Sequence, residues 1–91
     1  MEKTIKRSLF MINNTSLDTL KPHQRATVTS LLGDGEIIQR FEDLGIIPGT
    51  EIVCLMISPL GDPAAYLIRD ALIAIRREDA AKIGVCYGTD V

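Results

Sequence analysis

Short apolar runs, each bounded by glycine, proline or aspartate, divide the chain into segments of strand length. From Arg25 to Leu32, Ala26, Val28 and Ser30 alternate with Arg25, Thr27 and Thr29, which is the period of two expected of a strand with one buried face. Similar runs predict further strands at 50–58, 64–68, 71–76 and 85–87. The pattern therefore predicts about five short strands.

One segment has a helical period instead. Ile37, Phe41 and Leu44 fall at i, i+4 and i+7, so they share one face of a short amphipathic helix. Asp34 is suited to cap a helix that begins at residue 35 or 36. Gly45 can adopt the left-handed conformation that ends a helix, and the residue after it can then contact Phe41. We expect this helix to end at Leu44.

Two single helical turns are also expected. Ser16 can cap one at 17–20, and Pro22 would end it because the residue before a proline disfavours helical angles. The second spans 77–82, with Gly84 as its stop before the last strand. Five strands, with the longer helix after the first and a single turn before the last, predict a small, partly open β-barrel.

Glycine and proline place the main turns of the chain. Pro48 and Gly49 suit the two central positions of a type II turn, so the chain should reverse there, directly after the helix end at Gly45. Pro59 and Pro63 bracket a second bend between two predicted strands. These five residues are the predicted structural turn positions.

A third turn is predicted at Arg69 and Asp70, because two residues are the usual length of a tight β-hairpin loop. Asp70 would need a positive φ there, which aspartate tolerates less easily than glycine.

The length of 91 residues is that of one domain. We expect the barrel to span 16–88, with a tail at 89–91. Residues 1–15 lack a sustained period and are expected to form a mobile extension, within which 9–12 could form a short strand or turn.

Composition bears on location and partners. Hydrophobic residues make up 46% of the chain, but no apolar run approaches the roughly 18 residues that a membrane span needs, so direct membrane insertion is not expected. Lys3, Lys6 and Arg7 precede an apolar run too short for a signal peptide, which predicts a cytoplasmic chain. The net charge of −2 argues against nucleic acid as a partner, because phosphate binding needs a basic face.

Candidate chemistry is sparse. His23 is the single histidine and lies beside Pro22, so no nucleophile and base pair is indicated and the chain is not expected to be an enzyme. Cys54 and Cys86 lie on separate predicted strands without a C-x-x-C pair, which indicates reduced thiols and no closed zinc site. No metal site and no cofactor are predicted, and weak binding of Fe(II) or another metal is left open.

The loop between Pro59 and Pro63 has two interpretations. It is either a rigid bend in which Asp62 bonds its own backbone, or a preorganised tip whose Leu60 is exposed for a partner. The candidate partner-binding residues are therefore Leu60, Gly61 and Asp62, together with Arg40 on the helix, which could reach a carboxylate of a partner. A surface arginine on a helix most often has no such role.

Three motifs in order resemble one family. They are RFEDLGIIPG at 40–49, SPLGDP at 58–63 and LIAIRREDA at 72–80. Together they look like the ferrous iron transport protein A (FeoA) family, with a likeness that spans roughly 17–85. The chain departs from the family's pattern at His23, at Asp70, where a glycine usually makes the hairpin, and in its N-terminal extension.

The resemblance implies an SH3-like barrel in the cytoplasm that assists FeoB, a membrane protein with a GTP-binding domain that carries Fe(II) inward. The leading hypothesis is thus a non-enzymatic accessory protein of ferrous iron transport that docks on a FeoB-type transporter. The alternative is a regulatory module, because similar SH3-like domains form the C-terminal part of iron-dependent repressors. Weak self-association is also left open.

Overall fold

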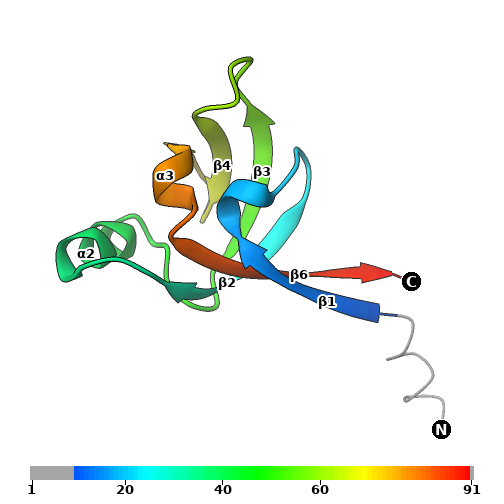
Figure 1. The fold of residues 1–91 in the computed structure, drawn as a ribbon, viewed down its shortest axis with the longest axis horizontal. Coiled ribbons are helices and arrows are strands. Elements are labelled where there is room, and N and C mark those ends of the chain that lie inside the picture. Colours follow the sequence, from blue (N-terminus) through cyan, green and yellow to red (C-terminus); the bar gives the residue numbers. More distant parts are fainter. Residues whose placement is uncertain (1–9, 91) are drawn as a thin grey trace, which may run out of the picture.

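The computed structural model describes residues 10–90 as one small, mainly β unit (Figure 1). Its strands are β1 (Phe10–Ser16), β2 (Arg25–Leu31), β3 (Glu51–Ile57), β4 (Ala64–Ile68), β5 (Ala71–Ile75) and β6 (Ile83–Asp90). Its helices are the 3-10 turn η1 (Leu17–Thr19), α2 (Gly35–Asp43) and the single turn α3 (Arg77–Ala80).

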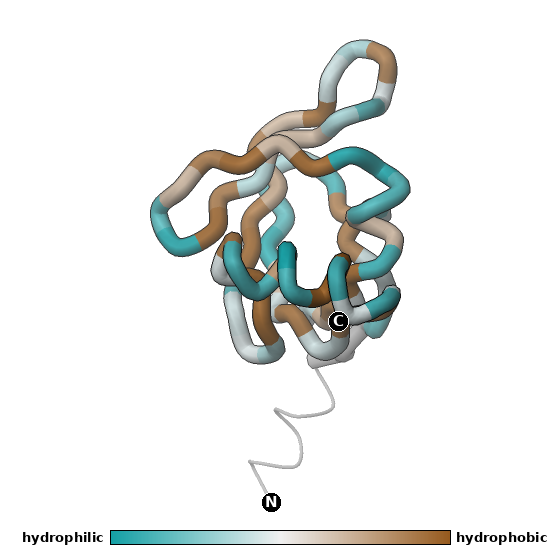
Figure 2. Tube along the Cα trace, turned by 90° about the vertical axis from the view of Figure 1, so that its left-hand side faces the viewer, coloured by the Kyte–Doolittle hydropathy of each residue, from teal (hydrophilic) through white to brown (hydrophobic). Residues whose placement is uncertain are grey.

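All six strands belong to one open antiparallel sheet with the order β1-β6-β2-β3-β4-β5. This confirms the predicted fold class, with six strands in place of about five. In Figure 2 the hydrophilic residues lie on the helices as well as at turns that link the strands. Within residues 10–90, β1 and β5 each pair with one neighbour only, so they form the two edges of the sheet.

The two ends of the chain differ from the prediction. Residues 10–15, expected within a mobile extension, lie in β1, which pairs with β6 from Phe10 opposite Asp90 to Ser16 opposite Gly84. Residues 89 and 90, expected in a tail, belong to β6, and Gly84 lies inside that strand instead of before it. The pairing joins opposite ends of the chain, and no local apolar period indicates it. Residues 1–9 and 91 of the predicted extension and tail lie outside the described residues.

The core is formed by inward side chains of the central strands and of η1. Ala26 and Val28 on β2 are buried between exposed neighbours, which confirms the predicted period of two at these positions. Ser30, expected on the same inward face, is exposed, because the register with β6 shifts between Val28 and Ser30. Side chains that are less than 2% exposed come from several different parts of the chain and include Leu17, Ile46, Ile52, Cys54, Ile68, Ile83 and Val85. Their removal from water is the main source of stability in a domain this small.

The ends of α2 match the sequence prediction. Asp34 Oδ1 accepts a hydrogen bond from the Ile37 amide at 2.9 Å, which satisfies one free N–H of the first turn. At the other end, the Gly45 amide donates to the Glu42 carbonyl and the Ile46 amide to the Phe41 carbonyl, both at 2.9 Å. This is a Schellman ending with Gly45 at φ +85°. The cap also buries Ile46 completely.

The turns at Pro48-Gly49 and at the β4–β5 hairpin are confirmed as well. The Thr50 amide donates to the Ile47 carbonyl across Pro48 and Gly49, and Gly49 has φ +97°, as a type II turn requires. In the hairpin both Arg69 and Asp70 have positive φ, at 49° and 68°, although we expected it of Asp70 alone. Two consecutive left-handed residues form the type I′ turn, whose twist matches that of the flanking strands.

Replacing Asp70 with glycine is expected to stabilise the chain by about 0.5 kcal/mol. Glycine relieves the steric cost of the left-handed angle, and its greater freedom in the unfolded chain cancels part of that gain. Urea unfolding measures the difference. Asp70→Ala is the matched control and should destabilise, because alanine removes the side chain but keeps the Cβ. A clear loss of stability in Asp70→Gly would contradict the prediction and assign a stabilising contact to the Asp70 side chain.

Candidate functional site

The loop between β3 and β4 projects from one end of the molecule (Figures 1 and 2). Leu60 lies at its tip and is 94% exposed, the most exposed of the large hydrophobic side chains in the described part of the chain. Two backbone hydrogen bonds close the loop, from the Gly61 amide to the Ser58 carbonyl at 2.7 Å and from the Ser58 amide to the Pro63 carbonyl at 3.1 Å. Gly61 has φ +87°, and the Asp62-Pro63 peptide bond is cis. The tip is therefore an ordered bend that exposes an apolar side chain.

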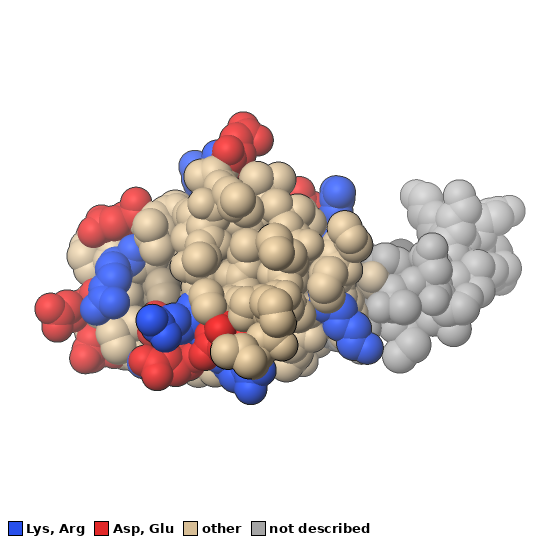
Figure 3. Space-filling model, turned by 90° about the horizontal axis from the view of Figure 1, so that it is seen from above, with Lys and Arg blue, Asp and Glu red and all other residues tan. Residues whose placement is uncertain are grey.

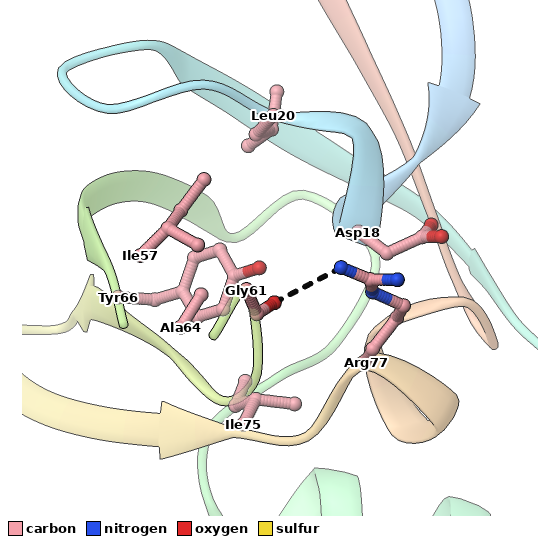
Figure 4. A pocket seen from close by; sticks show the side chains of 8 residues that line it. All are labelled: Asp18, Leu20, Ile57, Gly61, Ala64, Tyr66, Ile75 and Arg77. Carbon is pink, nitrogen blue, oxygen red and sulfur yellow. Dashed lines mark hydrogen bonds between the residues drawn. The ribbon is translucent and has the colours of Figure 1, made fainter. Parts of the chain in front are cut away.

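The loop is also held from outside, by the first residue of α3. The Arg77 amide donates to Asp62 Oδ1 at 2.8 Å. In addition, Arg77 Nη2 donates to the Gly61 carbonyl at 3.1 Å (Figure 4). The residue before α3, Arg76, makes no side-chain cap, so Asp62 caps this helical turn from another part of the chain. The expectation that Asp62 bonds its own backbone was therefore wrong. Its carboxylate joins the loop to α3.

Behind the loop lies a cavity of about 60 Å³ that includes Asp18, Gly61, Tyr66 and Arg77 in its lining (Figure 4). Small-molecule sites are usually several times larger, so this cavity is small for a substrate site.

Tyr66 is 2% exposed and its hydroxyl donates to the Leu17 carbonyl at 3.4 Å. Burial raises the pKa of Tyr66 to about 12, and the Cys54 thiolate, once it forms at high pH, and the carboxylates of Asp18 and Asp62 act in the same direction. Burial also raises the pKa of the Cys54 thiol. Neither group is a nucleophile or a base near neutral pH.

The raised pKa of Tyr66 predicts a loss of stability at high pH. An unfolded tyrosine loses its proton near pH 10, whereas folded Tyr66 keeps it until about 12. The contribution of protonated Tyr66 to the free energy of unfolding is complete below pH 10. It is lost as the pH rises to 12, at roughly 1 kcal/mol per pH unit. Urea unfolding of the parent and of Tyr66→Phe across this range measures it, with Tyr87→Phe as the control. Equal slopes in the parent and Tyr66→Phe would contradict the prediction.

An apolar face continues from the loop onto the outer side of β3, β4 and β5. The register places Met56 beside Ala65 and Ala65 beside Ala74, and these side chains border a groove of about 190 Å³. Further along the same face, Leu67 pairs with Leu72, which is 67% exposed. Seen from the side on which the loop projects, uncharged atoms cover the centre and the charges lie around the rim (Figure 3).

Sequence reasoning missed Met56. Alternation with the buried residues Ile52 and Cys54 would turn Met56 inward, but the register with β4 shifts between Cys54 and Met56, and Met56 is 59% exposed. A bulge of this kind reverses the facing of the residues after it. The sequence did carry a signal for this apolar face. Residues 64–68 and 71–75 lack polar residues, although a strand with one solvent-exposed face should have some.

Among the predicted partner residues, the structure brings Leu60, Gly61 and Asp62 together in one loop but does not place Arg40 with them. Arg40 lies on α2 and lines a separate groove that includes Ala74 and Arg76.

Within residues 10–90 we looked for a cluster of metal ligands and for a helix that could span a membrane. In that part of the chain no three histidine, cysteine or acidic side chains gather closely enough to hold a metal ion. His23 is exposed in a turn with φ +74°, and Cys54 and Cys86 are free thiols. None of the helices described is long and apolar enough to cross a membrane.

Comparison with known proteins matches this chain to a family profile described as FeoA domain, over residues 15–86. A Fe(2+) transport protein A/Fe(2+) transporter FeoB fusion protein of Porphyromonas gingivalis is 36% identical over 69 residues, which is 76% of this chain and 8% of the fusion protein. The chain thus spans a small fraction of that relative.

Solved structures agree in fold. The solution structure of FeoA from Chlorobium tepidum is 35% identical, with a TM-score of 0.73 over 78% of this chain and 68% of that one. FeoA of Stenotrophomonas maltophilia complexed with zinc, described as a procaryotic SH3 domain protein, is 25% identical, with a TM-score of 0.69 over 78% of this chain and 88% of that one. IdeR of T. acidophilum shares the fold alone, at 22% identity and a TM-score of 0.70 over 79% of this chain and 33% of that chain.

Proposed function

The chain belongs to the FeoA domain family, and from this premise we propose that it is a non-enzymatic accessory protein of ferrous iron uptake. In this proposal it works in the cytoplasm and docks on the GTP-binding cytoplasmic part of a FeoB-type membrane transporter. Iron passes through the transporter, and the small chain contributes a binding surface.

The observation behind this proposal is the fusion protein of Porphyromonas gingivalis, in which a region similar to this chain is joined to a FeoB transporter. Covalent linkage keeps two modules at a high effective concentration, which is useful when the modules bind each other. A separate chain of the same family would have to supply that proximity through affinity, so it needs a docking surface.

The loop tip and the apolar face beside it fit that need. Interfaces draw most of their affinity from a few well-placed side chains, and ordering a flexible loop on binding is costly. Here two backbone hydrogen bonds and two contacts with Arg77 already hold the loop, so Leu60 is presented without further ordering. Met56 and the alanines of β4 and β5 supply the neighbouring apolar surface.

The direct test is binding of the purified chain to the isolated cytoplasmic portion of a FeoB-type transporter from the same source, measured by calorimetry with and without a GTP analogue. Saturable binding at one to one would support the proposal. Absence of binding in both nucleotide states would contradict it.

The alternative of a regulatory module rests on the fold shared with IdeR. Within residues 10–90 there is no helix-turn-helix reader beside the sheet, because α2 is followed by a strand and α3 is a single turn. The fusion with a transporter therefore favours the accessory role. A transporter gene beside this one would support that role, whereas a repressor operon would support the alternative.

The purified chain is expected to hold far less than one ion of iron or zinc per molecule. The reason is the lack, in the described part of the chain, of three ligand side chains close together. Metal analysis of the protein after gel filtration measures the content. One tightly held ion per chain would contradict the prediction. It would mean that residues which form no ligand motif in the sequence act together as metal ligands.

A further inference from the structure

Strand β5 offers an unpaired backbone edge. The tight turn at Arg69 and Asp70 makes Ile68 and Ala71 a hydrogen-bonded pair, and bonded and non-bonded pairs alternate along an antiparallel ladder. The N–H and C=O groups of Leu72 and Ala74 therefore point away from β4. Within residues 10–90 no other strand pairs with β5, and no backbone bond outside the ladders involves 71–75.

A groove lies beside the end of this edge. It has a volume of about 250 Å³ and runs between the C-terminal end of β5, at Ala74, and the face of α2 that carries Ile37, Phe41 and Leu44. Phe41 is buried, whereas Leu44 is 43% exposed. One wall thus offers free backbone groups, and the other offers an apolar helix face.

The rim of the groove carries unpaired positive charge. Arg40 on α2 and Arg76 after β5 both line the groove and are exposed, with Asp79 as the acidic residue among the lining. Within the described residues, the one ion pair closer than 4 Å joins Arg25 and Glu51, so neither Arg40 nor Arg76 has a carboxylate that close. Two guanidinium groups without such partners favour an acidic occupant.

We propose that an extended, acidic segment of a partner protein adds to the sheet as a seventh strand along β5. Its backbone bonds to Leu72 and Ala74, its carboxylates meet Arg40 and Arg76, and an apolar side chain enters the groove against α2. Strand addition of this kind takes affinity from main-chain hydrogen bonds and specificity from alternate side chains. The inference goes beyond the proposed function, because it concerns the backbone edge of β5, which borders the proposed docking face, and names a class of ligand.

The test uses a capped seven-residue peptide of alternating valine and threonine with glutamate at each end. The nuclear magnetic resonance spectrum of the isotope-labelled full chain is followed up to millimolar peptide. We expect saturable shifts at Leu72 and Ala74 and slower hydrogen exchange of their amides. The same peptide with N-methyl groups on the residues facing β5 cannot form the ladder and should give no such protection.

Charge is tested separately. A peptide with lysine at each end should bind about tenfold more weakly, and Arg40→Ala should weaken the acidic peptide about threefold. Glu42→Ala, on the same helix but outside the groove, is the matched control and should bind as the parent does.

Three outcomes overturn the inference. The first is no response at Leu72 and Ala74 at millimolar peptide, and the second is equal binding of the acidic and lysine peptides. The third is protection of these amides in the free chain that rises with its concentration, which would show that a second copy occupies the edge. This test contains a peptide and no transporter. Its failure is therefore distinct from failure of the proposed docking on the transporter.

Discussion

Leu60→Asp is expected to weaken binding of the transporter's cytoplasmic portion by at least about tenfold. A carboxylate in place of a central apolar anchor must be desolvated without a partner, and hot-spot losses of this kind amount to about 2 kcal/mol or more. The isolated chain should keep its melting temperature, because Leu60 is 94% exposed and the hydrogen bonds that hold the loop involve other residues. Calorimetry measures the binding, and circular dichroism the fold.

Leu32→Asp is the matched control for Leu60→Asp. Leu32 is also an exposed leucine, at 60%, and it follows β2, away from the loop. This variant should bind as the parent does. If Leu60→Asp binds normally, the loop is a bend without a role in docking. If instead its melting temperature falls sharply, Leu60 stabilises the fold and the docking surface must lie elsewhere, first around Arg40.

Gly45→Val is expected to lower the free energy of unfolding by about 2 to 3 kcal/mol. A β-branched residue at φ +85° is strained wherever it stands, and the new Cβ would lie 2.9 Å from Arg69 Cδ, which would have to move. The Schellman hydrogen bonds that bury Ile46 depend on the same backbone angle. In a domain of this size the loss corresponds to a fall in melting temperature of roughly 10 °C.

Gly35 supplies the control for Gly45→Val, because it lies in the same helix and no atom lies within 4 Å of a Cβ built on it. Gly35→Ala should be neutral or slightly stabilising, since alanine has the better helix propensity. A melting temperature of Gly45→Val within a degree or two of the parent would refute the cap.

The parts of the fold that local chemistry determines were predictable. Asp34, Gly45 and the Pro48-Gly49 turn act within a few residues of themselves, so their types and spacing were sufficient. The pairing of β1 with β6 was not predictable in the same way, because its register comes from backbone hydrogen bonds between distant segments.

The candidate site shows the same division. The exposure of Leu60 followed from its place between two prolines in a short loop. The bond from the Arg77 amide to Asp62 and the outward turn of Met56 depend on how α3 and β4 sit against β3, which the local sequence does not encode. Arg40 was singled out for the chemistry of its guanidinium, but only the fold places it beside Arg76 and the edge of β5.

The pairing of Phe10 with Asp90 has a practical consequence for how this domain can be joined to other proteins. The chain enters and leaves the sheet at one point, while the β3–β4 loop projects from another end of the molecule (Figure 1). Domains whose two ends lie close together tolerate insertion into a host loop with little distortion. A carrier, tag or solid support attached through either end should therefore leave the Leu60 tip free to meet its partner.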